Sequence, residues 1–297
     1  MRLEYLSGET EIMKKPTPRA SPKSQPATTI PKPMPMIWQD IERIRAERPL
    51  VHNITNYVVM NTTANALLAI GASPVMAHAL EEVEEMVRLA RALVINIGTL
   101  SPPWVRAMIK AGKEARRRKI PVVLDPVGSG ATRYRTTVAQ KLLREVAPTI
   151  IRGNASEIRS LLGHEAGTRG VESRQTPDQV MDEARALSTT AGCVVSVSGP
   201  VDLIVEGNAV VWISNGHSMM ARVTGMGCTA SAITGAFAAV NPQTLKAAAH
   251  AMAVMGIAGE MAAEHSAGPG SFQMHFLDTL SGIQESDIAQ RLKMQGG

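Results

Sequence analysis

The fold is decided by residues 92–128, which read ALVINIGTLSPPWVRAMIKAGKEARRRKIPVVLDPVG. An apolar run at residues 92–97 predicts a buried strand that ends at Gly98. Residues 102–119 predict a long helix, with Ser101 as its N-cap and prolines in its first turn. A second apolar run, residues 121–124, predicts another buried strand, which ends at Asp125. Two apolar strands joined by a helix are typical of a parallel sheet.

The same alternation continues on both sides of this segment. Further strands are expected at residues 73–77, 149–151, 194–197, 202–205 and 209–213, with a hairpin turn at Gly207-Asn208. Further helices are expected at residues 37–47, 61–70, 80–91, 136–147, 179–191, 227–240, 243–263 and 284–294. This pattern predicts an α/β fold with a mainly parallel central sheet, covered by helices on both faces. Ligands bind such sheets beyond the carboxyl ends of the strands.

The first 35 residues differ from the rest of the chain. Residues 14–36 contain seven prolines, separated by Ser, Thr and Lys. A segment of this composition cannot bury enough apolar surface to offset the entropy lost on ordering. We therefore expect a flexible N-terminal extension at residues 1–35 and a single folded domain at residues 36–297.

The composition argues against several classes of protein. No apolar run reaches the roughly 18 residues of a membrane span. The first residues show no apolar core followed by a small-residue cleavage site, so we expect that the protein is not secreted. Two cysteines in 297 residues argue against a disulfide framework and fit a cytoplasmic location. The net charge of +5 is scattered, and aromatic residues make up only 3% of the chain, so we expect no nucleic-acid partner.

The sequence TGMGC, residues 224–228, predicts a tight turn that opens an apolar helix. Glycines allow close approach of the backbone to a ligand, and N–H groups at a helix start bind anions. We expect the backbone of Met226 and Gly227 to form an anion hole. Cys228 would lie at the positive helix end, where the pKa of a thiol falls from about 8.5, and it is the candidate catalytic residue. The alternative is that Cys228 is a small core residue.

The sequence RGNASE, residues 152–157, follows a predicted strand. The guanidinium of Arg152 suits a phosphate. Asn154 and Glu157 share one face of a helical turn, and an amide with a carboxylate suits Mg²⁺. The alternative is an N-cap at Asn154 completed by Glu157 in a capping box.

Asp125 opens the glycine-containing loop DPVGSGAT, residues 125–132. Its carboxylate could help to hold Mg²⁺. The alternative is that Asp125 only stabilises a turn. The amides and hydroxyls of HNITN, residues 52–56, indicate either a polar substrate pocket or a hydrogen-bonded loop. Together, these candidates at one sheet edge supply what phosphoryl transfer needs, namely positioning, a metal ion and neutralisation of charge.

Six blocks in collinear order resemble the hydroxyethylthiazole kinase family of the ribokinase-like superfamily: PLVHNITN (49–56), GASPVM (71–76), NIGTL (96–100), LDPVG (124–128), IRGN (151–154) and VTGMGC (223–228). The resemblance implies a ribokinase-like three-layer α/β/α sandwich. It also implies transfer of the γ-phosphoryl group of ATP to the primary hydroxyl of 4-methyl-5-(2-hydroxyethyl)thiazole, with Mg²⁺, in thiamine salvage. The alternatives are a related kinase acting on a pyrimidine alcohol and a non-catalytic ligand-binding homologue.

The resemblance also implies roles for single residues. Cys228 takes the place of the catalytic Asp of the wider superfamily, and Met226 departs from the small residue or Thr usual in the family. The family is a homotrimer with active sites between subunits, and Asn56 and Met76 resemble its neighbour-donated wall. The implied sets are ATP-binding Arg152, Ser198 and Asn154, substrate-binding Met76, Gly225 and Asn56, and metal-binding Asp125 and Glu157.

Overall fold

The computed structural model describes residues 34–163 and 177–296. Almost all of the predicted extension at residues 1–35, and residues 164–176, lie outside the described residues. Among the residues described, no helix is long and apolar enough to span a bilayer.

The described strands form one nine-stranded sheet in the order β2-β1-β3-β4-β5-β6-β7-β8-β9. Strands β1 to β6 are parallel, and β7, β8 and β9 continue the sheet with antiparallel pairs. The mainly parallel α/β fold is thus confirmed. The strands are β1 (Leu50–Ile54), β2 (Ser73–Val75), β3 (Ala92–Asn96), β4 (Val122–Asp125), β5 (Ile150–Asn154), β6 (Val194–Ser198), β7 (Asp202–Glu206), β8 (Ala209–Ile213) and β9 (Met294–Gly296).

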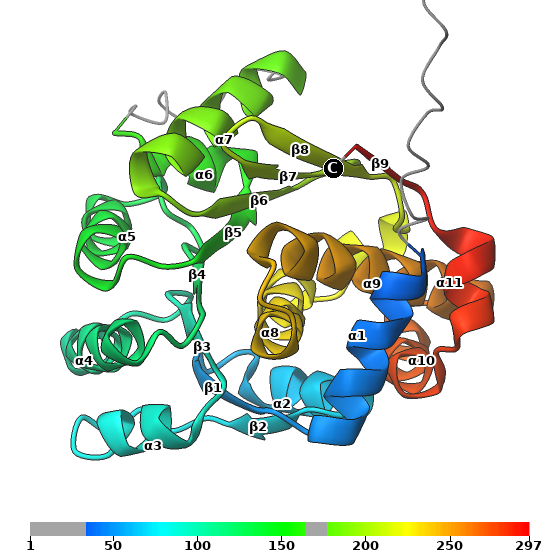
Figure 1. Ribbon diagram of the computed structural model, residues 1–297, viewed down its shortest axis with the longest axis horizontal. Helices are drawn as coiled ribbons and strands as arrows, with labels where there is room; N and C mark the ends of the chain where they lie inside the picture. Colours follow the sequence, from blue (N-terminus) through cyan, green and yellow to red (C-terminus); the bar gives the residue numbers. More distant parts are fainter. Residues whose placement is uncertain (1–33, 164–176, 297) are drawn as a thin grey trace, which may run out of the picture. The chain divides into compact units, whose positions relative to one another are not determined.

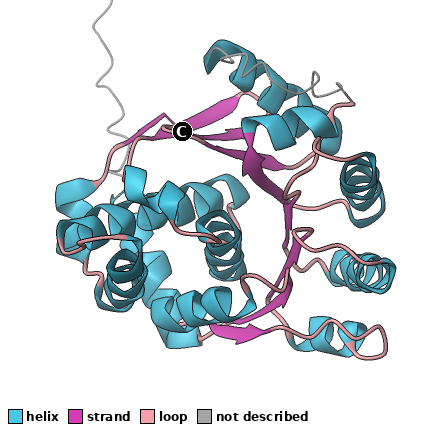
Figure 2. Ribbon diagram, turned by 180° about the vertical axis from the view of Figure 1, so that it is seen from behind, coloured by secondary structure: helices cyan, strands magenta, loops and turns pink. Residues whose placement is uncertain are grey.

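Helices cover both faces of this sheet, which gives three layers (Figure 1). One layer contains α3 (Val83–Leu89), α4 (Pro102–Arg118), α5 (Arg133–Val146), α6 (Ala155–Leu161) and α7 (Pro177–Ala191). The other contains α1 (Met34–Glu47), α2 (Met60–Ile70), α8 (Met226–Val240), α9 (Thr244–Glu264), α10 (Pro269–Gly282) and α11 (Glu285–Arg291). Seen from behind, the strands separate the two groups of helices (Figure 2).

The central strands are apolar on both faces because each face has its own core. On β3, Val94 belongs to the core under α8 and α9, whereas Leu93 and Ile95 belong to the core under α3 to α7. This is the alternation of side chains along a strand. Helix α8 lies close to the sheet, since a Cβ added to Gly235 would come within 2.7 Å of Val94.

Three features of the sequence-based assignment were wrong or missed. Strand β1 was missed because His52 and Asn53, both fully buried, interrupt its apolar pattern. Helix α10 was missed, and the helix expected at residues 284–294 ends at Arg291, because pairing with β8 forms β9. Ser101 occupies the N-cap of α4, but its side chain makes no capping hydrogen bond.

The parallel strands bring the candidate residues to one edge of the sheet. Asn96 at the end of β3 lies opposite Asp125 at the end of β4. Asn154 at the end of β5 lies opposite Ser198 at the end of β6. This is the edge at which ligands bind in open α/β sheets.

Candidate active site

A cavity of about 820 Å³ lies at this edge, between the strand ends and the start of α8. Its walls include all the predicted site residues except Asn56 and Met76. They are Asp125, Arg152, Asn154, Glu157, Ser198, Gly225, Met226, Gly227 and Cys228. Residues from the ends of three strands (β4, β5 and β6) and from the starts of two helices (α6 and α8) therefore meet in one place.

Helix α8 begins with backbone N–H groups that have no helical acceptor. Gly225 is its N-cap, with φ of 85°, a conformation that favours glycine. A Cβ at Gly225 would also lie 2.6 Å from Val59. The first helical hydrogen bond runs from the N–H of Thr229 to the carbonyl of Gly225 at 2.8 Å. Among the described residues, nothing accepts from the N–H groups of residues 226–228, which can therefore bind an anion.

A chain of hydrogen bonds joins Cys228 to Asp125 across the ends of three strands. Asn56 donates from Nδ2 to Sγ of Cys228 at 3.5 Å and to Oδ1 of Asn96 at 2.8 Å. Asn96 donates in turn from Nδ2 to Oδ2 of Asp125 at 2.7 Å. The start of α8, where Cys228 lies, is therefore connected to the Asp125 carboxylate at the end of β4.

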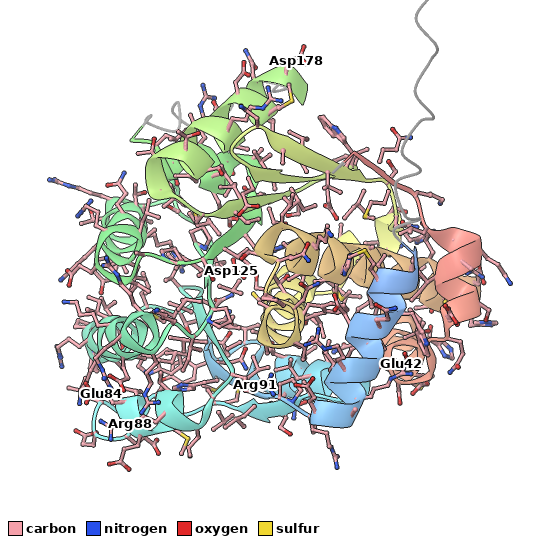
Figure 3. All side chains as sticks on the ribbon, in the orientation of Figure 1. Glu42, Glu84, Arg88, Arg91, Asp125 and Asp178 are labelled. Atoms are coloured by element: carbon pink, nitrogen blue, oxygen red, sulfur yellow. The ribbon has the colours of Figure 1, made fainter. Side chains whose placement is uncertain are left out.

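Asp125 is 1% exposed and lies near the centre of the molecule, between the sheet and helices α8 and α9 (Figure 3). Burial raises the pKa of this carboxyl to about 7, against the opposing effects of the Arg152 charge and a hydrogen bond from Ser231. The nearby Glu157 carboxylate raises the same pKa further. Two carboxylates that repel each other across a cavity form an environment that favours a cation.

The expectation of a lowered pKa for Cys228 was wrong. The thiol does lie in the first turn of α8, but burial, together with the nearby Asp125 charge, raises its pKa to about 11. Desolvation of a thiolate outweighs the partial charge of a helix end here. At neutral pH the group is therefore a thiol.

Arg152 places a buried positive charge in the same cavity. It is 8% exposed, and its Nη1 donates to the carbonyl of Gly227 at 3.0 Å. Its Nε has no partner among the described residues. A Cβ at Gly227 would lie 2.9 Å from Nη1, so glycine is needed there to let the guanidinium approach the helix start.

Asn154 and Glu157 form the capping box that was the alternative interpretation of their spacing. Asn154 Oδ1 accepts from the N–H of Glu157 at 2.9 Å, and Glu157 Oε2 accepts from the N–H of Asn154 at 2.8 Å. Glu157 Oε1 also accepts from the N–H of Gly128 at 2.8 Å. The same carboxylate lines the cavity, so its structural role does not exclude contact with a ligand.

The described residues fit a Mg²⁺ ion that takes only a few of its ligands from the protein. They contain no group of three or more His, Cys, Asp or Glu side chains suited to a metal ion. Mg²⁺, however, often takes one or two protein carboxylates and completes its shell with phosphate oxygens and water. Asp125 and Glu157 supply two carboxylates to this cavity, and both hydrogen bonds to Asp125 end on Oδ2.

The far end of the cavity is built from residues near β6, β7 and β8. Ser198 lies at the end of β6, and its Oγ donates to the carbonyl of Gly153 at 3.3 Å. Asp202 accepts from the N–H of Gly199 at 3.1 Å, and burial raises the pKa of Asp202 to about 6. The walls here also include Met220, Met252 and Met255, which suit a flat apolar group.

Asn56 and Met76 do not line the cavity. Asn56 is 3% exposed and contacts Cys228 of its own chain. Within this chain its side chain is held by Asn96 and Cys228, and the role of Asn56 in binding substrate stays a prediction. Met76 is half-buried in the segment after β2, which is tied to β1 by the 2.7 Å contact of His52 Nε2 with the carbonyl of Ala77.

Several residues of the site were missed by reasoning from the sequence. Asn96 lies inside the run at residues 92–97, which by itself predicts only a buried strand, and Ser231 lies inside an apolar helix with no motif around it. Asp202 begins an antiparallel strand, so its side of the sheet could not be inferred from the parallel pattern. Met252 and Met255, which form part of the cavity wall, lie on a helix whose small apolar residues indicate only a core helix.

Comparisons with known proteins agree on one family. A model of the hydroxyethylthiazole kinase family matches residues 41–286. A protein of Syntrophus aciditrophicus named hydroxyethylthiazole kinase is 60% identical over 88% of this chain and 97% of its own length. A protein of the same name from Nitratidesulfovibrio vulgaris is 54% identical over 87% of this chain and 97% of its own length.

The solved structures agree with this assignment. The structure of a hydroxyethylthiazole kinase protein from Pyrococcus horikoshii has a TM-score of 0.82 and 46% identity, and the match covers 89% of this chain and 99% of that one. A pyridoxal kinase from Staphylococcus aureus in complex with AMP-PCP has a TM-score of 0.56 at 14% identity, covering 72% and 88% of the two chains. That second likeness concerns the fold alone and supports a ribokinase-like sandwich.

Proposed function

The chain belongs to the hydroxyethylthiazole kinase family, and on that premise we propose that it transfers the γ-phosphoryl group of ATP to the primary hydroxyl of 4-methyl-5-(2-hydroxyethyl)thiazole. One observation carries this proposal. The unpaired N–H groups at the start of α8 open into the same cavity as the Arg152 guanidinium and the Cys228 thiol. Anion binding and an acceptor site therefore meet at one point.

The phosphates of ATP are held from two sides. The N–H groups of residues 226–228 donate to oxygens of the moving phosphoryl group, and their orientation is fixed before the substrate arrives. Arg152 neutralises the charge that develops on the same oxygens, with its guanidinium held against the carbonyl of Gly227. Because phosphoryl transfer passes through a loose transition state, such positioning and charge neutralisation supply most of the catalysis.

The alcohol is placed beside Cys228. A thiol with a pKa of about 11 is not a strong base at neutral pH, so we assign Cys228 the role of orienting the hydroxyl. Little deprotonation is needed before the bond to phosphorus forms. Asn56 holds Sγ in place, and Gly225 leaves room for the alcohol next to the helix start.

Asp125 and Glu157 are the residues that would hold Mg²⁺ on the phosphate side. A metal ion held there would supply neutralisation of phosphate charge. The carboxylates of this chain would orient it, since Asp125 is fixed by Asn96 and Ser231, and Glu157 by two backbone N–H groups.

The nucleotide base would lie towards β6, β7 and β8. The cavity runs from Asp125 on β4 to Asn215 after β8, four strand spacings along the sheet, or about 19 Å. Cys228 belongs to the β4 end through its chain of hydrogen bonds to Asp125. The Met-lined wall at the other end, with Ser198 and Asp202 on the sheet side, then receives the base and ribose.

The proposed assembly is a cytoplasmic homotrimer in which Met76 reaches the active site of a neighbouring subunit. It is supported by Tyr57 and Val58, each 64% exposed, in the turn that follows Asn56. Two exposed apolar side chains beside the acceptor site suit a contact with a second copy. Light scattering on the purified protein tests this part, and a monomer would overturn it.

The reaction is tested by incubating the purified protein with ATP, MgCl₂ and a panel of thiazole and pyrimidine alcohols. We expect phosphorylated 4-methyl-5-(2-hydroxyethyl)thiazole, detected by mass spectrometry, in amounts equal to the ADP released. If only a pyrimidine alcohol were phosphorylated, that alcohol would replace the thiazole alcohol as the proposed substrate. ADP release that no alcohol stimulates would overturn the proposed function.

A further inference from the structure

One wall of the cavity is the loop between β8 and α8, residues 214–225. This loop contains a short 3-10 turn, η1 (Ser218–Arg222). Asn215, His217, Met220 and Val223 are among the cavity-lining residues that it supplies. Whatever holds this loop in place also shapes the end of the cavity that we assign to the nucleotide base.

Asn215 attaches the loop to the C-terminal part of the chain. The residue is 6% exposed. Its Nδ2 donates to the carbonyl of Arg291 at 2.7 Å and to Oε1 of Glu260 at 3.2 Å. Its Oδ1 accepts from the N–H of Lys293 at 2.8 Å. The loss of any of these hydrogen bonds would leave a buried polar group without a partner, which costs free energy. The Asn215 amide therefore holds the loop 214–225 in place.

Glu260 on α9 joins the same contacts. Its Oε1 accepts from the N–H of Gly216 at 3.1 Å and from Nζ of Lys293 at 2.9 Å. The N–H of Ser214 donates to the carbonyl of Lys293 at 2.9 Å. Lys293 therefore contacts the loop and its anchor through its N–H, its carbonyl and its side chain.

The adjacent surface of α9 is shaped for this loop. Gly256 and Gly259 are three residues apart, so they share a helix face. A Cβ at Gly256 would lie 2.6 Å from Asn215, and one at Gly259 would lie 2.5 Å from Sδ of Met220. Only glycine at these two positions lets the loop approach α9 so closely, while α11 and β9 lie beside α9 and β8 (Figure 1).

We propose that the segment from Arg291 to Lys293, acting through Asn215, is a positioning element for nucleotide binding. This segment lies beyond residues 41–286, which the family model matches. The inference rests on the proposed function, because it assigns the loop 214–225 to the nucleotide. It predicts that loosening the loop at Asn215 weakens binding of ATP and leaves binding of the alcohol unchanged, because Asn215 holds the start of the loop, whereas Gly225 at its other end is fixed as the N-cap of α8.

The first test separates the backbone of Lys293 from its side chain. Lys293→Pro removes the N–H that donates to Asn215, and its matched control, Lys293→Ala, keeps that N–H and removes only the partly exposed ammonium group. We expect Lys293→Pro to raise the KM for ATP about tenfold, the effect of one lost hydrogen bond. The KM for the alcohol should stay within about twofold. Lys293→Ala should raise the KM for ATP by no more than about twofold, because the contact of its 57% exposed side chain with Glu260 is weak. Equal KM values for ATP in the two variants, or a parallel rise for both substrates, would overturn the proposal.

A second pair of variants tests the same proposal without changing the backbone next to β9, where Lys293→Pro could cause misfolding. Asn215→Asp places a carboxylate beside Glu260 and should weaken ATP binding at least about tenfold, because a second negative charge at this buried position repels the partly buried Glu260. Glu260→Gln added to Asn215→Asp removes the repulsion between the two carboxylates and should restore part of the affinity, while the lost hydrogen bond to the carbonyl of Arg291 remains lost. A double variant as weak as Asn215→Asp alone would count against coupling through this contact.

Nucleotide affinity is measured directly by isothermal titration calorimetry with ATP and MgCl₂, in the absence of alcohol. This readout does not depend on the identity of the acceptor. A protein that binds ATP but phosphorylates no thiazole alcohol would refute the proposed substrate and leave the positioning element testable. Unchanged ATP affinity in Lys293→Pro and Asn215→Asp, in an active enzyme, would refute the positioning element alone.

Discussion

The hydroxyl of Ser231 on α8 donates a 2.7 Å hydrogen bond to Oδ2 of Asp125 at the end of β4. Both residues are almost fully buried. The contact joins the helix that provides the anion site to the strand that provides the carboxylate. It therefore contributes both to stability and to the geometry of the site.

Replacing this serine should affect stability and activity together. Ser231→Ala leaves the buried carboxylate with one donor fewer, and hydrogen bonds to charged groups are worth about 1.5–3 kcal/mol. We expect the free energy of unfolding in urea to fall by that amount, and kcat/KM to fall about tenfold because Asp125 is less well held. Ser101→Ala is the control, since its hydroxyl caps nothing, and should stay within about 0.5 kcal/mol. Indistinguishable unfolding curves for the two variants would contradict the prediction.

The burial of Asp125 should make stability depend on pH. Its pKa is about 7 in the folded chain, against 3.8 without burial. Between these values the folded state keeps a proton that the unfolded state releases, so the free energy of unfolding falls as the pH rises from about 4 to about 7, and this effect levels off above 7.

Asp125→Asn removes this titration and keeps an oxygen that can accept from Asn96 and Ser231. We expect a higher Tm than wild type at pH 8, a smaller difference at pH 5, and loss of most of the kinase activity. Calorimetric scans at the two pH values measure the difference. A gap of constant size would mean that the carboxyl does not titrate in this range.

The thiol of Cys228 should react slowly with alkylating agents. With a pKa of about 11, its thiolate fraction at neutral pH is small and rises about tenfold per pH unit. The rate of carbamidomethylation by iodoacetamide, followed by intact mass, should rise in the same way from pH 7 to pH 9. Cys228→Ala identifies the signal, because Cys193 is buried and its pKa is about 12. A rate that levels off near pH 8 would restore the thiolate as a catalytic base.

Much of this site could be predicted because its residues follow strands that are apolar enough to recognise. Asp125 and Arg152 were placed at the sheet edge in this way. The pKa of Cys228 could not be predicted, because a helix start is visible in the sequence, but the burial around it comes from β1 and β3. Asn215 was missed because its partners, Glu260, Arg291 and Lys293, are joined to it only by the folding of the C-terminal segment.

Gly227 should tolerate no side chain. A Cβ there would lie 2.9 Å from Nη1 of Arg152, so Gly227→Ala must displace the guanidinium from the helix start. We expect kcat/KM to fall about 100-fold, as when one transition-state donor is lost, with little loss of stability because alanine favours a helix. Gly282→Ala, on a helix and with nothing within 4 Å of the added Cβ, is the matched control and should remain fully active.

The two roles of Glu157 can be separated by comparison with a second capping box. Glu157 caps α6 and lines the cavity, whereas Asp287 accepts from the N–H of Gln284 at 2.9 Å to cap α11. Glu157→Gln and Asp287→Asn should each cost about 0.5–2 kcal/mol of stability through a weakened cap. Only Glu157→Gln should raise the Mg²⁺ concentration needed for half-maximal activity, by about tenfold, because it removes one of the two carboxylates that face the phosphates.

A titration of activity with MgCl₂ at saturating ATP measures this difference. If the two variants lose stability alike and require the same Mg²⁺ concentration as wild type, Glu157 is a cap alone. Asp125 and the phosphates would then hold the ion, because the described residues contain no group of three or more His, Cys, Asp or Glu side chains suited to a metal ion. A shift confined to Glu157→Gln would instead mean that one carboxylate fixes the loop at Gly128 and orients the metal ion, so that the geometry of the cap sets the geometry of the reaction.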